Sequence, residues 1–144
     1  MFIHNGAAGQ MTAVVQGNTI DTLDQVNSFA GMYLQTGSNT GALGDNNKSC
    51  LTIDGTTAAL KNNIDVGANA GFAIATGIFV EQEGVSRVGL LDSPNYGGAA
   101  YDSTAVQTFV AALNTVTGSN ATAVTAIHDA GSPAGGGYFG TCPP

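Results

Sequence analysis

The chain has 144 residues with 21 Gly, ten Asp or Glu and three Lys or Arg, which gives a net charge of −7. Nucleic acid is excluded as an expected partner, because phosphate contacts need several Lys or Arg side chains. The same deficit disfavours anionic membranes. No apolar run approaches the roughly 20 residues of a membrane span. If Met1 is the natural start, the absence of a signal peptide predicts folding in the cytoplasm.

The first elements are expected to be short. Met11–Gln16 predicts a strand. Asp21–Ala30 has apolar residues at helical spacing, with Asp21 as a candidate N-cap and Gly31 as a candidate stop. Met32–Gln35 predicts a further strand. Gly37–Lys48 has little apolar content and predicts an exposed loop.

The central part of the chain is rich in β-forming residues. Ser49–Ile53 predicts a strand that enters a turn at Asp54-Gly55, with Thr57–Leu60 as its return. Gly71–Leu91 contains two β-rich runs on either side of Glu83-Gly84. This pattern predicts an antiparallel hairpin.

The last part combines a helix, a strand and a tail. Asp92–Tyr101 predicts a loop, and Ser103 or Thr104 is expected to cap a helix over Ala105–Val116, which has apolar residues at i, i+3, i+4 and i+7. Ala121–Ile127 predicts a short strand. Gly131–Pro144 is rich in Gly and Pro and is expected to be flexible or extended.

Together these elements predict a mainly β or α+β fold. We expect a small antiparallel sheet or barrel-like domain with one or two helices. Residues 1–130 would form a single domain, and residues 131–144 a flexible C-terminal tail. Parallel βαβ wrapping is disfavoured, and no internal repeat is apparent along the chain.

The two cysteines, Cys50 and Cys142, leave two interpretations open. They can form a disulfide that closes a long loop, which would add about 4–5 kcal/mol in the chain-entropy model. They can equally be two reduced thiols, as a cytoplasmic origin would favour. Two cysteines are too few for a zinc site, and no metal ligand set or cofactor site is predicted.

Several motifs resemble functional sites, but each lacks the required context. Gly135–Gly140 matches G-x-G-x-x-G, yet the chain ends before a helix could follow. His4 and His128 would need further ligands such as Asp21 or Asp129 to bind a metal. Surface histidines are the preferred interpretation. No triad of catalytic residues can be nominated from the order of Ser, His and Asp.

Acidic and glycosylation motifs are also better explained without a special function. Glu81 and Glu83 are two residues apart on a predicted strand, which is compatible with acid–base chemistry. Charges beside a hairpin turn more often protect a strand edge. Asp45–Asn47 does not match an EF-hand loop. Asn47–Ser49 and Asn120–Thr122 fit the glycosylation pattern and are interpreted as chance matches.

These observations favour a non-catalytic protein that works in an assembly. Neutral Thr and Asn surfaces can be buried between subunits without desolvating charges. The C-terminal half of the chain is rich in Thr, Ala and Gly and poor in Lys. It contains the predicted hairpin Gly77–Leu91, the capped helical segment Thr104–Asn114 and the strand-like segment Ala123–Ala126. In this composition and in its strand–helix–strand order, the chain resembles virion structural proteins of tailed bacteriophages. Among these it is most similar to small capsid decoration (cement) proteins.

The resemblance implies a virion location and binding to the capsid lattice. The implied partners are the major capsid protein or other virion subunits, often with the decoration protein as a homo-oligomer. A tail-tube or tail-fibre component and an extracellular filament or surface-layer subunit are alternatives. An enzyme, such as a small hydrolase, is the hypothesis from a different class.

Overall fold

The fold is a winding of short parallel strands with one helix. The computed structural model describes residues 1–6, 9–21, 30–37, 47–53, 55, 57–68, 76–91, 103–119, 122–128, 137–139 and 141–142. The elements in chain order are β1 (Phe2–Asn5), β2 (Gln10–Val14), β3 (Thr19–Asp21), β4 (Ala30–Thr36), β5 (Lys48–Thr52), β6 (Asn63–Ala68), β7 (Thr76–Gln82), β8 (Arg87–Leu90), α1 (Ser103–Ala112), β9 (Thr115–Ser119), β10 (Thr122–His128) and β11 (Gly137–Phe139).

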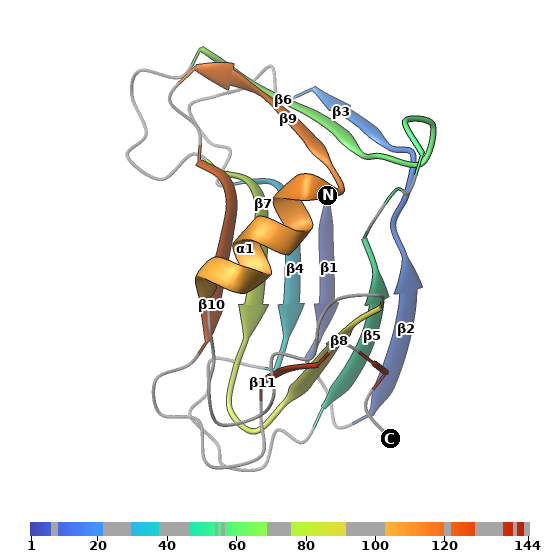
Figure 1. Ribbon diagram of the computed structural model, residues 1–144. Coiled ribbons are helices and arrows are strands. Elements are labelled where there is room, and N and C mark those ends of the chain that lie inside the picture. Colours follow the sequence, from blue (N-terminus) through green and yellow to red (C-terminus); the bar gives the residue numbers. More distant parts are fainter. Residues whose placement is uncertain are drawn as a thin grey trace.

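The described strands form three sheets, and every strand pair in them is parallel. Sheet A has the order β1-β4-β7-β10, sheet B the order β11-β8-β5-β2, and sheet C the order β3-β6-β9. Each strand from β1 to β8 therefore pairs with the strand whose number is three higher (Figure 1). Helix α1 lies in the chain between β8 and β9. The chain visits sheets A, B and C in turn, which is the topology of a parallel β-solenoid. We call each such winding a rung.

The prediction of an antiparallel sheet or barrel is wrong, and so is the hairpin at Glu83-Gly84. β7 pairs with β4 and β10 in sheet A, whereas β8 pairs with β5 and β11 in sheet B. The turn between them is bound to the preceding rung. The Glu83 N–H and the Ser86 hydroxyl both donate to the Thr36 carbonyl, each at 2.9 Å. These bonds bend the chain from one sheet to the next, so it does not reverse.

Two other predicted boundaries differ in the structure. Thr57–Leu60 is a turn and not a returning strand, because the Leu60 and Lys61 N–H groups both donate to the Thr57 carbonyl. The helix ends at Ala112. Asn114 donates from its side chain to the Val110 carbonyl at 2.8 Å, and Thr115 then begins β9.

Other predictions are matched in part or fall outside the described residues. The strands predicted near residues 11, 32, 49 and 121 correspond to β2, β4, β5 and β10. The predicted helix at Asp21–Ala30 lies outside the described residues except for its ends, which belong to β3 and β4. Of the exposed loop predicted over Gly37–Lys48, residues 38–46 lie outside the described residues, Gly37 and Asn47 are buried, and Lys48 begins β5. The loop predicted over Asp92–Tyr101 also lies outside the described residues. Within the predicted flexible tail, Gly137–Phe139 forms β11 beside β8.

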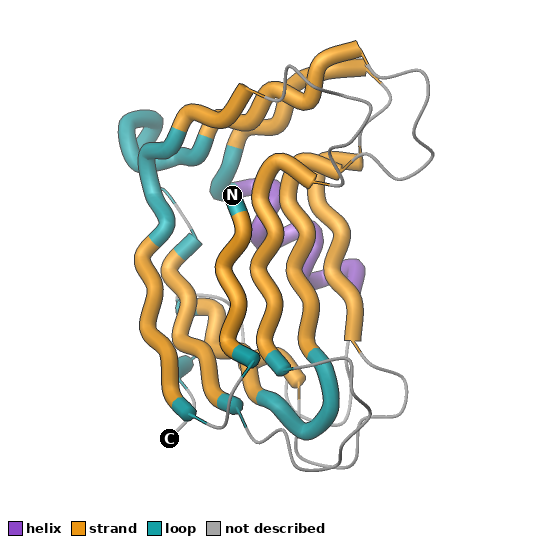
Figure 2. The backbone as a smooth tube through the Cα atoms, turned by 180° about the vertical axis from the view of Figure 1, so that it is seen from behind, coloured by secondary structure: helices purple, strands orange, loops and turns teal. Residues whose placement is uncertain are grey.

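The core runs along the inside of the solenoid. Inward side chains at matching positions of successive rungs form columns, such as Ile3, Leu34 and Val80 in sheet A and Ala13, Leu51 and Leu90 in sheet B. Helix α1 lies on the inner face of sheet A and is behind that sheet in Figure 2. No helix in the described part of the chain is long and apolar enough to cross a membrane.

Candidate interface at the amino-terminal end of the solenoid

The first rung leaves one end of the solenoid open. β1, β2 and β3 each pair on one side only, with β4, β5 and β6 respectively. Their other edges have no partner strand among the described residues (Figure 2). We call the surface formed by β1, β2, β3 and Asn18 the open end. In the part of the chain that the structure describes, no strand pairs with these outer edges, and the same holds for the outer edges of β9, β10 and β11 at the other end.

The apolar core reaches the open end and is only partly covered there. In the second rung the column members Leu34, Leu51 and Ile64 are buried to 2% exposure or less. Their register partners in the first rung, Ile3, Ala13 and Ile20, are also apolar but only half-buried. Met11, which lies opposite Ser49, is half-buried as well. An additional rung would complete the burial of these side chains. Apolar area removed from water stabilises by about 25 cal/mol per Å².

A ladder of asparagine side chains follows the corner between sheets B and C. Asn18 Nδ2 donates to Asn62 Oδ1 at 2.9 Å, and Asn62 Nδ2 donates to Asn114 Oδ1 at 2.7 Å. Asn62 Nδ2 also donates to the Val15 carbonyl at 2.8 Å, which holds the corner of the rung before it. Asn62 is fully buried, so these bonds are shielded from water. Each amide thus joins one rung to the next.

The ladder is open at one end and closed at the other. Asn18 Nδ2 donates to Asn62 Oδ1 and to the Gln16 carbonyl, and no described residue donates to Asn18 Oδ1. At the opposite end, Asn114 Nδ2 donates to the Ile53 carbonyl at 2.9 Å and to the Val110 carbonyl of α1 at 2.8 Å. Helix α1 therefore terminates the ladder, whereas the open end retains an acceptor.

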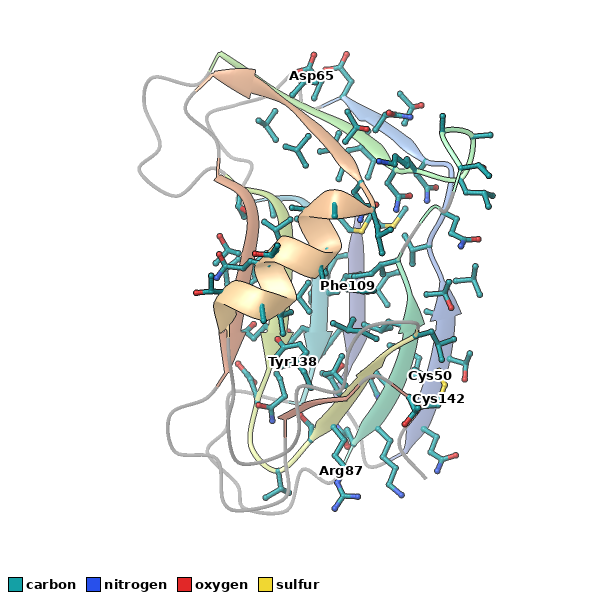
Figure 3. All side chains as sticks on the ribbon, in the orientation of Figure 1. Cys50, Asp65, Arg87, Phe109, Tyr138 and Cys142 are labelled. Atoms are coloured by element: carbon teal, nitrogen blue, oxygen red, sulfur yellow. A yellow bond between two sulfur atoms is a disulfide. The ribbon has the colours of Figure 1, made fainter. Side chains whose placement is uncertain are left out.

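At the carboxyl-terminal end the core beside sheets A and B is covered, whereas Val116 of β9 in sheet C is only partly buried. Val106 and Val110 of α1 are fully buried, and Val124 and Tyr138 of the last rung are exposed by only 3% and 2%. The Tyr138 hydroxyl donates to the Val80 carbonyl at 3.1 Å. Figure 3 shows Tyr138 below α1, toward the interior. The two ends of the solenoid are thus unlike each other.

Large apolar side chains stand on the outer side of the open end. Phe2 is 59% exposed and Val14 66% exposed. Phe2 lies in register with Tyr33, with ring centroids 5.0 Å apart, and stacks on the His4 ring at 5.6 Å. Phe2 and Val14 extend the apolar character of the open end onto its outer rim.

Glu81 and Glu83 are not a solvated edge pair. Both residues are more than 90% buried. Glu81 accepts a hydrogen bond from the Tyr33 hydroxyl on the neighbouring strand. Burial of the Tyr33 ring, and then this bond to Glu81, raise the pKa of Tyr33 well above its ordinary value. Glu83 lies in the corner after β7, and its backbone N–H donates to the Thr36 carbonyl.

The two histidines lie at opposite edges of sheet A. His4 is in β1 and His128 in β10, with β4 and β7 between these strands. The His4 Nε2–H donates to the Gly37 carbonyl at 2.9 Å. Asp129 lies outside the described residues. Across the described part of the chain, no three His, Cys, Asp or Glu side chains are grouped closely enough to hold a metal ion.

Cys50 and Cys142 are joined by a disulfide, with their Cα atoms 4.9 Å apart. Figure 3 shows the two residues together beside β5. Cys50 is in the second rung, and Cys142 follows β11 of the fourth rung. The bond therefore ties the end of the described chain back across sheet B.

The other motifs contribute no further site. Gly137–Phe139 of the glycine-rich motif is a strand, and Gly135, Gly136 and Gly140 lie outside the described residues. Asn47 is fully buried and donates to the Asn5 carbonyl at 2.8 Å, which removes it from a glycosylating enzyme. Asp45, Asn46, Asn120 and Ala121 are outside the described residues.

The hydrogen-bonded ladder of Asn18, Asn62 and Asn114 was not predicted from the sequence. Asn18, Asn62 and Asn114 each precede the pattern Thr/Asn, Ile/Val, Asp/Thr, and this pattern is an internal repeat. Its spacings of 44 and 52 residues are unequal, which hides it from a search at fixed period. No protein family, no curated protein and no solved structure matches the chain.

Proposed function

We propose that the chain is a non-catalytic structural subunit of a larger assembly. The observation that supports this most is the difference between the two ends of the solenoid. Both ends present three strand edges without a partner strand among the described residues. At the carboxyl-terminal end α1 terminates the asparagine ladder and the core of sheets A and B is covered, while the other end has more half-buried core residues and an open acceptor. Such an end is suited to a protein neighbour that supplies a strand.

The polar groups of the interior support a structural role. Asn62, Ser86 and Gln82 are fully buried, and their donor groups are used in bonds that connect rungs or hold corners. The disulfide adds a covalent tie across sheet B. These features suit a rigid spacer that presents flat side faces, and they require no chemistry of the side chains.

Within this class we propose a virion structural protein. The favoured form is a capsid decoration protein that binds the major capsid protein and stabilises the capsid lattice, acting as a homo-oligomer. A disulfide is compatible with a virion surface, which is an oxidising environment. It is equally compatible with the second candidate, a tail-fibre or extracellular filament subunit.

The test is to isolate large particles from the source and to search them for this chain by mass spectrometry. We expect many copies per particle, with density on the capsid lattice in electron micrographs. Density on the tail, or on a cell-surface filament, would replace the decoration role with the second candidate. Recovery of the chain only as a free protein that turns over a small substrate would refute the structural role.

A further inference from the structure

We propose that the Cys50–Cys142 disulfide is a reducible latch, which releases β11 from sheet B when an external dithiol reduces it and leaves the other rungs folded. This inference goes beyond the proposed assembly role and does not depend on it. The sequence contains two cysteines, and they are bonded to each other. A dithiol reductant therefore acts on this one bond of the chain.

The disulfide holds β11 in place across an intervening strand. β8 lies between β11 and β5 in sheet B. Phe139 of β11 is in register with Gly89 of β8, and Gly89 is in register with Cys50 of β5. The chain therefore crosses β8 between Phe139 and Cys142. The bond fixes the end of this crossing to the second rung.

β11 is a short edge strand that gains much from such a covalent tie. It has three residues and pairs with β8 on one side. It contributes Tyr138 to the core, where the hydroxyl donates to the Val80 carbonyl. Ordering so short a strand costs conformational entropy that few ladder hydrogen bonds offset. The disulfide lowers this cost, because residue 142 stays at sheet B even when β11 dissociates.

The two sulfur atoms differ in their access to solvent. Cys142 is exposed, whereas Cys50 is only 7% exposed. A hollow of about 80 Å³ is lined by both cysteines and also by Gln10, Thr12 and Lys48. An attacking thiolate therefore reaches Cys142 from solvent, and Cys50 is the sulfur that leaves.

Basic side chains are concentrated beside this leaving sulfur. The chain has three Lys or Arg residues, and two of them, Lys48 and Arg87, are in register on β5 and β8. Lys48 is two residues from Cys50 on β5, so both side chains lie on the outer face of sheet B. Positive charge near a sulfur stabilises its thiolate, which makes Cys50 a better leaving group.

The reduction is an exchange of two thiols for two thiols. One thiolate of the dithiol attacks Cys142 Sγ, the bond between the two cysteine sulfur atoms breaks, and its electron pair leaves on Cys50 Sγ. The second thiolate then attacks the reductant sulfur bound to Cys142, which releases Cys142 Sγ and forms the disulfide of the reductant. The two protons that the dithiol loses are taken up by the two cysteines.

Release of β11 opens the carboxyl-terminal end of sheet B. Tyr138 is in register with Val88, which is fully buried while β11 is in place. In the reduced chain Val88 and the edge of β8 become the end of the sheet. The redox state of the surroundings therefore sets whether this end is closed or open.

The experiment is amide hydrogen exchange of the full-length chain with and without dithiothreitol. We expect exchange in residues 137–142 to be about tenfold or more faster after reduction. In the reduced chain these residues should exchange before β4 and β7, as local release requires. The double variant Cys50→Ser with Cys142→Ser should give the same pattern without reductant. Exchange in residues 137–142 that reduction leaves unchanged, or that matches β4 and β7 in the reduced chain, would overturn the inference.

A second measurement tests the path of the reduction. Lys48→Gln is expected to slow the reduction by dithiothreitol about threefold, as measured by alkylation of the freed thiols and mass spectrometry. Lys61→Gln is the matched control, because it removes the same charge from a side chain whose Nζ donates to the Ala112 carbonyl in another part of the molecule. This variant should be reduced at the rate of the unchanged chain. Equal slowing by both substitutions, or by neither, would contradict a role of Lys48 beside the leaving sulfur.

Discussion

Replacing Asn62 by Ala is expected to destabilise the fold strongly. The Asn62 side chain accepts from the Asn18 N–H at 3.2 Å and from Asn18 Nδ2 at 2.9 Å, and it donates to Val15 and Asn114. Alanine leaves the Val15 carbonyl and Asn114 Oδ1 without this donor. Both belong to buried residues. Each unsatisfied buried group costs about 1–3 kcal/mol, which gives about 2–6 kcal/mol in total.

Asn63→Ala is the matched control for this loss. Asn63 is the next residue, is exposed, and makes one weak side-chain bond of 3.4 Å to the Lys61 carbonyl. Its substitution is expected to change the free energy of unfolding by no more than about 0.5 kcal/mol. Urea unfolding followed by circular dichroism measures both variants. Equal destabilisation by Asn62→Ala and Asn63→Ala would refute the reasoning that the asparagine ladder holds the rungs together.

Three further changes test other parts of the structure. Cys142→Ser removes a disulfide that spans 92 residues, and we expect a loss of about 4–5 kcal/mol in urea unfolding; the same stability in reduced and oxidised protein would contradict this. The raised pKa of Tyr33 means that the unfolded chain loses its phenolic proton first, so stability should fall as the pH rises above about 10. Tyr33→Phe should flatten this fall, and an unchanged alkaline slope would count against the buried bond to Glu81. Gly37 has a φ of +98°, and an added Cβ would lie 2.6 Å from the Glu83 carbonyl oxygen. Gly37→Ala should therefore lower the thermal midpoint more than Gly17→Ala, where φ is also positive but the nearest atom is 3.1 Å away.

The sequence predicts individual elements better than their pairing. The amphipathic pattern of α1 and the β-rich runs of β5, β7 and β10 are local signals, and these elements are present. The partners of each strand are not local. β4 pairs with β7 across more than 40 residues, and no turn connects them. Glu83-Gly84 resembles a hairpin turn because the bonds that redirect it come from Thr36 on another rung.

The candidate interface could not be predicted from local sequence patterns either. Ile3, Met11 and Ile20 have the same apolar character as Leu34 and Ile64, so the sequence alone does not separate an end rung from an inner one. The distinction depends on which strands have a neighbour on both sides. The asparagine repeat can be found in the sequence, but only by a search that accepts unequal spacing between its three copies.

The most direct test of the central claim is amide hydrogen exchange of the chain in its assembled and isolated forms. We predict that assembly slows exchange in residues 2–5, 10–14 and 19–21, whose outer edges have no partner strand among the described residues. Exchange in α1 and β8 should change little. Protection that appears in α1 or β10 upon assembly, with none at the open end, would contradict the account.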